Sequence, residues 1–160
     1  MSDLSNTITN GFAAAYQDYV RRVRALAEPL SEEQFWRKPY PYGNSFGHLT
    51  LHLTGNLNYY VGAQIAGTGY VREREREFTE SHPPSKDEAL RRLDEVAALV
   101  VQTLNAQRAE DWARDYQAVG ADYTRDRFGA FLRCATHFYH HIGQMIYLAK
   151  ELAKEQPQVQ

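Results

Sequence analysis

The fold class follows from residues 131–145, FLRCATHFYHHIGQM, which carry the clearest periodicity in the chain. At about 100° per residue, the apolar side chains of this segment fall on one face of a helix. That face comprises Phe131, Ala135, Phe138, Ile142, Met145 and, beyond the segment, Ala149. Such a stripe is typical of a helix that packs against a core. We therefore predict a long amphipathic helix from about Thr124 to about Glu155.

Three further long helices are predicted from the same period and from helix-end signals. They span about residues 3–27, 44–66 and 85–107, with the second beginning at either of two good N-caps, Asn44 or Ser45. A capping box at residues 31–34 predicts a short helical turn between the first two. The stretch before the last helix lacks a clean period, and a short extended piece is expected around residues 116–119.

These elements together predict an all-α protein, a four-helix bundle with one long crossover connection between its second and third helices. A chain of 160 residues is close to the usual size of one domain, so residues 1–160 are expected to form a single unit. Residues 156–160 are expected to be a frayed tail.

The composition excludes several classes of function. Hydrophobic residues make up 43% of the chain and charged residues 24%, and the formal charge is −2, so no basic excess favours nucleic acid. No apolar run is long enough to span a bilayer, and residues 1–5 lack the order of a secretory signal. The single cysteine, Cys134, excludes an internal disulfide. We expect a cytoplasmic protein.

Five of the six histidines fall in two clusters on predicted helices. His48 and His52 lie one turn apart on the second helix, as do His137 and His141 on the last, and this spacing lets two imidazoles reach one cation. On the helical wheel, His137 and His141 flank the apolar stripe on the same side, whereas His140 points away from it. His52 lies closer to the stripe of its helix than His48 does. The best set of ligands is therefore His52, His137 and His141.

Three imidazole ligands would leave one position of a divalent metal open, as in catalytic rather than structural zinc sites. Imidazole also suits nickel, iron and copper. A single histidine on a helix flank is more often an ordinary hydrogen-bonded residue, so the metal-site interpretation depends on the joint pattern. His48 is the nearest spare imidazole for catalysis.

Three other features have two interpretations each. The alternating charges of residues 72–77 favour a solvated surface, but Arg72 or Arg74 could instead bind an anionic group of a substrate. Cys134 is either a buried inert thiol or, with a lowered pKa, a nucleophile. The abundant aromatic residues either fill gaps between helices or line a pocket beside the metal.

Several segments resemble one known family. Residues 44–57 resemble the second helix of the DinB/YfiT-like proteins, residues 137–144 resemble their last helix, and residues 72–74 with Glu77 and Phe78 match a pattern found between these helices. The likeness extends from about residue 36 to about residue 152.

The resemblance implies a bundle with up-down-down-up topology, often dimeric, in which His52, His137 and His141 bind the metal. It also implies supporting roles for Gln144 and Glu77. Related proteins include thiol-dependent transferases and isomerases, which use a low-molecular-weight thiol, and metal-dependent hydrolases. The leading hypothesis is therefore a homodimeric metalloenzyme, preferably with zinc, that acts on a small molecule. The alternatives are a non-catalytic metal-binding or stress-response protein and a dimeric interaction module.

Overall fold

The computed structural model describes residues 3–154, and this part of the chain is helical and contains no strand. The predicted all-α class is thus confirmed. The elements are α1 (Asp3–Ala27), α2 (Glu32–Trp36), α3 (Phe46–Leu57), η1 (Asn58–Ala66), α4 (Arg76–Thr79), α5 (Lys86–Asn105), η2 (Ala109–Asp111) and α6 (Arg127–Ala153). The predicted tail of residues 156–160 lies outside the described residues.

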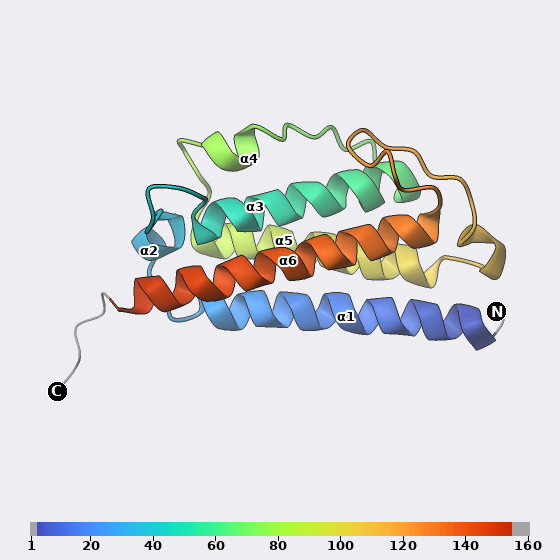
Figure 1. The fold of residues 1–160 in the computed structure, drawn as a ribbon, viewed down its shortest axis with the longest axis horizontal. Coiled ribbons are helices and arrows are strands. Elements are labelled where there is room, and N and C mark those ends of the chain that lie inside the picture. The colour runs from blue at the N-terminus through green and yellow to red at the C-terminus, as the bar shows by residue number, and fades with distance from the viewer. Residues whose placement is uncertain (1–2, 155–160) are drawn as a thin grey trace.

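The four long segments α1, α3, α5 and α6 lie side by side, and the connections lie at the two ends except for the long one between η1 and α5 (Figure 1). Helix α1 packs against α5 and α6, and α3 packs against the same two helices. In the view of Figure 1 the chain runs in one direction along α1 and α6 and in the opposite direction along α3 and α5.

The core lies between these helices and uses the stripe that the sequence predicts for α6. Phe131, Phe138 and Met145 are fully buried, and burial of each such side chain contributes about 1.5–3 kcal/mol. Tyr16 of α1 is also fully buried and donates its hydroxyl proton to the carbonyl oxygen of Phe131 at 3.0 Å. This bond satisfies the polar end of the tyrosine and fixes α1 against α6.

Side chains cap the first turns of several helices. Ser45 accepts a hydrogen bond from the His48 amide at 3.0 Å, and Ser85 accepts one from the Glu88 amide at 3.2 Å. The capping box at Ser31 is present as predicted. Two boundaries differ slightly from the prediction: α6 begins at Arg127 behind the cap Asp126, and α5 ends at Asn105. Where the sequence predicts a short extended piece, around residues 116–119, no named strand forms, and an isolated bridge pairs residue 115 with residue 126.

The second predicted helix changes its winding halfway. Residues 58–66 form a π-helix, which ends at Gly67 with a φ of +71°. The wider π turn belongs to a helical form that often occurs at functional sites. Tyr59 and Tyr60 of this segment bind the connection before α6: Tyr60 donates to the carbonyl of Val119 at 3.0 Å, and the Val119 amide donates to the Tyr59 hydroxyl at 3.2 Å.

The long connection between η1 and α5 passes over α3 (Figure 1). It contains the short helix α4, which packs on α3. This path brings one carboxylate, that of Glu77, against the buried face of α3, where Glu77 is only 7% exposed.

Candidate metal centre

Three histidines from two helices converge between α3 and α6. The ring centroids of His52 and His137 lie 5.1 Å apart, those of His52 and His141 4.9 Å, and those of His137 and His141 4.5 Å. One ring nitrogen from each residue lies within 4.8 Å of the other two. The Nε2 atoms of His52 and His137 are 3.0 Å apart. These are the three residues that the helical phases select, and they are placed so that they can hold one metal ion.

Hydrogen bonds to Nδ1 fix the tautomers of two of the rings. His52 Nδ1 lies 2.8 Å from Glu77 Oε2, and since a carboxylate only accepts, Nδ1 carries the proton. His141 Nδ1 lies 2.7 Å from Gln144 Oε1, a carbonyl-type oxygen, and donates in the same way. Both rings therefore present an Nε2 lone pair to the centre. Metal-binding histidines are usually oriented by this kind of partner on the other nitrogen.

The Nε2 atom of His141 has no hydrogen-bond partner among the described residues, although it is buried. A buried acceptor without a partner costs free energy, and its presence calls for an explanation such as a bound ion. The atom points toward two other imidazoles rather than toward a protein donor. The donor set, three imidazole nitrogens of which one has no hydrogen-bond partner, fits a divalent cation.

Burial also lowers the pKa of two of the three histidines, His137 and His141. Removal from water, together with the nearby rings of His141 and His52, lowers the pKa of His137 to about 3. Burial likewise lowers the pKa of His141 to about 4, against the opposing effect of its bond to Gln144. Near neutral pH both rings are uncharged, so each has one nitrogen lone pair available to a metal.

The model of one protein family, described as the DinB superfamily, matches residues 15–145. The chain belongs to the DinB superfamily. The matched region contains the three histidines, Glu77 and Gln144, and it confirms the predicted family. No curated protein shows a significant match to the chain. Within residues 3–154, no helix has both the length and the apolar character needed to cross a membrane.

In this DinB-superfamily chain the orienting residue Glu77 is itself held by a buried ion pair. Arg72 donates to Glu77 through Nε at 2.7 Å and through Nη2 at 2.8 Å, and both side chains are 8% exposed. Burial opposes ionisation of Glu77, but the bonds from His52 and Arg72 outweigh it and lower the pKa of the carboxyl group. The solvated interpretation of residues 72–77 is thus wrong for Arg72 and Glu77, although residues 73–76 are exposed.

Gly55 provides the space for this carboxylate. A Cβ atom at Gly55 would lie 2.0 Å from Glu77 Oε1 and 2.8 Å from its Cδ, so a side chain cannot coexist with the observed position of Glu77. Gly55 lies one turn after His52 on the same helix, which aligns the carboxylate with the imidazole. Sequence reasoning missed this residue. It could have been noticed because a glycine in a helix interior lowers helix stability by about 1 kcal/mol relative to alanine, so its presence there needs a reason.

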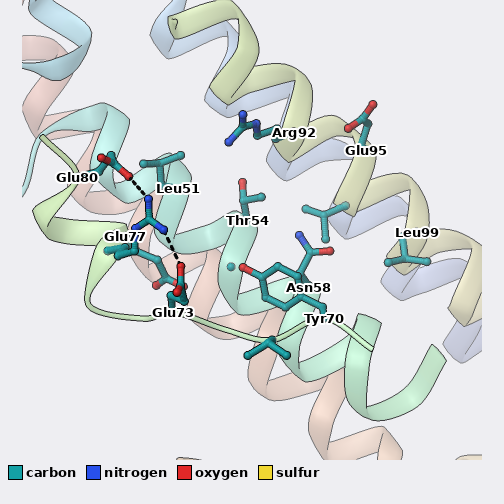
Figure 2. Close-up of a pocket in the computed structure, with 14 residues that line it drawn as sticks. Leu51, Thr54, Asn58, Tyr70, Glu73, Glu77, Glu80, Arg92, Glu95 and Leu99 are labelled. Atoms are coloured by element: carbon teal, nitrogen blue, oxygen red, sulfur yellow. Dashed lines mark hydrogen bonds and ion pairs between the residues drawn. The ribbon is translucent and has the colours of Figure 1, made fainter. Parts of the chain in front are cut away.

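A pocket of about 570 Å³ lies on the other side of Glu77, between α3, the long connection and α5 (Figure 2). Arg76 crosses its end and donates to Glu73 at 2.8 Å and to Glu80 at 3.1 Å. Its wall on α5 carries Arg92 and Glu95. None of the three histidines lines this pocket, so its position favours a structural rather than a chemical role.

A second pocket, of about 630 Å³, opens directly onto the histidines. His52 and His137 form part of its wall, together with three tyrosines and three arginines, Tyr59, Tyr60, Tyr70, Arg72, Arg74 and Arg133. Both arginines that the sequence selected for substrate binding line this pocket. Arg133 was missed, although it lies one turn before His137 on α6 and could have been found from that spacing.

The remaining sequence-selected residues lie outside the group of three histidines. His48 is buried against Ser45, with its Nδ1 2.6 Å from the serine Oγ, and against the ring of Trp36. His140 is exposed, as its helical phase predicts. Cys134 is 1% exposed, and burial raises the pKa of its thiol to about 12, which fits the inert interpretation.

Proposed function

We propose that His52, His137 and His141 bind one divalent metal ion and that the protein is a metal-dependent enzyme acting on a small molecule. The observation that carries this proposal is the buried Nε2 of His141, which faces two other imidazoles and has no hydrogen-bond partner. Zinc is the preferred ion for three imidazoles with an open position, and nickel and iron are the alternatives.

When bound, the ion would act as a Lewis acid that lowers the pKa of a coordinated water or thiol. The chain supplies the rest of the site. Glu77 and Gln144 keep the Nδ1 protons on His52 and His141, and Arg72 holds Glu77 in place. The tyrosine-rich pocket beside His137 has the size of a small-molecule site.

The reaction class that we favour is a thiol-dependent transfer or isomerisation, with a hydrolysis as the alternative. The protein's own thiol is unsuited to attack, since Cys134 is buried and its pKa is about 12. A low-molecular-weight thiol would therefore enter from solution through the pocket. Membership of the DinB superfamily supports this class by analogy.

We further propose the up-down-down-up topology and a cytoplasmic homodimer. The helix directions in Figure 1 support the first. Exposed apolar and aromatic side chains on α6, Leu132, Tyr139 and Tyr147, support the second. Sedimentation that shows only an 18.4 kDa species would reject the dimer.

The decisive experiment is elemental analysis of protein purified without a histidine tag. We expect about one metal ion per chain, lost in His52→Ala, His137→Ala and His141→Ala but retained in the matched control His140→Ala. Metal that is indifferent to all three changes would contradict the centre. Wild type that binds metal but shows no turnover with thiol and hydrolysis substrates would favour the non-catalytic metal-binding alternative.

A further inference from the structure

Arg133 is the cation of the metal-centre pocket that the proposed mechanism does not use. It lies on α6 one turn before His137, so the two side chains leave the same face of the helix about 5–6 Å apart. Its guanidinium carbon lies 4.1 Å from the centroid of the Tyr60 ring, and its Nη2 donates to the carbonyl of Gly120 at 3.1 Å. The side chain is thus held in position beside the histidines.

The surroundings of Arg133 leave its charge unbalanced. Arg72, on the opposite wall, is neutralised by Glu77, whereas Arg133 has no carboxylate partner in the described part of the chain. Its Nε and Nη1 atoms are buried and form no hydrogen bond of standard geometry, although the Tyr123 hydroxyl and the Cys134 thiol interact with the guanidinium. Buried donors without partners are costly, and they are costlier when they carry charge.

The wall of the pocket has the same imbalance. It contains three arginines and no aspartate or glutamate, although the chain as a whole has a formal charge of −2. A concave site that is lined by cations attracts anions and raises their local concentration. The planar, stacked guanidinium of Arg133 suits a planar anion such as a carboxylate.

The position of Arg133 is fixed by residues from two other segments. Tyr60, in the π-helical segment, stacks under the guanidinium, and Gly120 supplies the carbonyl that accepts from Nη2. Gly120 has a φ of +79°, and a Cβ there would lie 3.0 Å from the Tyr60 hydroxyl. A larger residue would therefore separate the connection from Tyr60. This arrangement resembles a built site more than a chance surface charge.

We propose that Arg133 binds the carboxylate of a small organic acid and thereby places the rest of that molecule beside His137. The inference deepens the proposed function, on which its catalytic meaning rests, and identifies the substrate class as carboxylic acids. The carboxylate would supply the negative charge that the wall of this pocket lacks. Arg74, exposed at the rim, would contribute less because it is solvated.

The test uses metal-free protein and two probes of matched shape, benzoate and benzamide, which differ in charge. Binding is followed by NMR through the Nε–Hε resonance of Arg133, identified by its absence in Arg133→Gln. We expect benzoate to shift this resonance, and Arg133→Gln to bind benzoate about tenfold more weakly. Arg133→Lys should retain part of the affinity, Arg74→Gln should lose less, and the remote control Arg21→Gln should lose none.

Two results would overturn the proposal: equal binding of benzoate by wild type and Arg133→Gln, or equal shifts with benzamide and benzoate. If Arg133→Gln does not fold, Arg133→Lys and the wild-type resonance still decide the question. Titration of the same metal-free preparations with zinc separates the two proposals. Benzoate binding without any zinc site would reject the metal centre alone, and a zinc site in wild type without benzoate binding would reject the acid subsite alone.

Discussion

Replacing Gly55 with alanine tests whether Glu77 orients His52. In an ordinary helix interior this change stabilises the protein by about 1 kcal/mol, because alanine has the higher helix propensity. Here the new Cβ would lie 2.0 Å from Glu77 Oε1, so the carboxylate has to move. Its displacement breaks the ion pair with Arg72 and the hydrogen bond with His52, both of which are buried.

The size of the effect follows from these contacts. Breaking a buried ion pair, with one charge left unpaired, costs about 3–5 kcal/mol. Subtracting the gain in helix propensity leaves a net loss of about 2–4 kcal/mol in the free energy of unfolding. Loss of the acceptor for His52 Nδ1 should also weaken zinc binding by about 10- to 100-fold.

Urea denaturation of the metal-free protein and competition with a zinc chelator measure the two effects. Gly11→Ala is the matched control, because Gly11 lies inside α1 and a Cβ there meets no atom within 4 Å. It should stabilise the protein slightly and leave zinc affinity unchanged. If Gly55→Ala behaves like Gly11→Ala in both assays, the carboxylate does not hold His52 and the argument fails.

Three further predictions concern single side chains. Glu77→Gln should weaken zinc binding about 10- to 100-fold in a chelator competition, since the amide is a poorer acceptor for His52 and leaves Arg72 unpaired; unchanged affinity would contradict this. Cys134, whose burial raises its pKa to about 12, should react with iodoacetamide at pH 8 only after denaturation, and rapid labelling of native protein, followed by mass spectrometry, would show the site to be open. Asp111 accepts side-chain and backbone hydrogen bonds from Arg108, which lower its pKa from 3.8 to about 2. Its contribution to stability is therefore complete above about pH 4 and is lost as the pH falls through about 2, so Asp111→Asn should destabilise the protein at pH 7 but not at pH 2 in urea titrations.

The features that could be predicted from sequence are those set by neighbours along the chain. The apolar stripe of α6, the capping serines Ser31, Ser45 and Ser85, and the pairing of His137 with His141 all depend on spacings of four residues or fewer. Helical phase also predicted one contact between helices, because it selected His52 rather than His48 as the residue that faces α6. The structure places His48 against Trp36 instead.

The features that could not be predicted depend on contacts between distant segments. The π-helical segment, residues 58–66, has only nine residues, too few for periodicity to distinguish it from an α-helix. The burial of Arg72 and Glu77 depends on the path of the long connection over α3, and alternating charges normally indicate a solvated surface. The need for glycine at position 55 can be recognised only once Glu77 is known to lie against it.

The buried Arg72–Glu77–His52 chain supports the metal-centre interpretation independently of the three histidines. A buried ion pair seldom adds net stability, because its Coulomb attraction barely repays the cost of removing two charges from water. Apolar residues of similar size would hold α4 on α3 at least as well. What such residues could not do is accept the Nδ1 proton of His52 and direct its other nitrogen at His137 and His141. The ion pair therefore serves to orient the imidazole of His52 more than to stabilise the fold. Such support is expected for a metal ligand and not for a core residue.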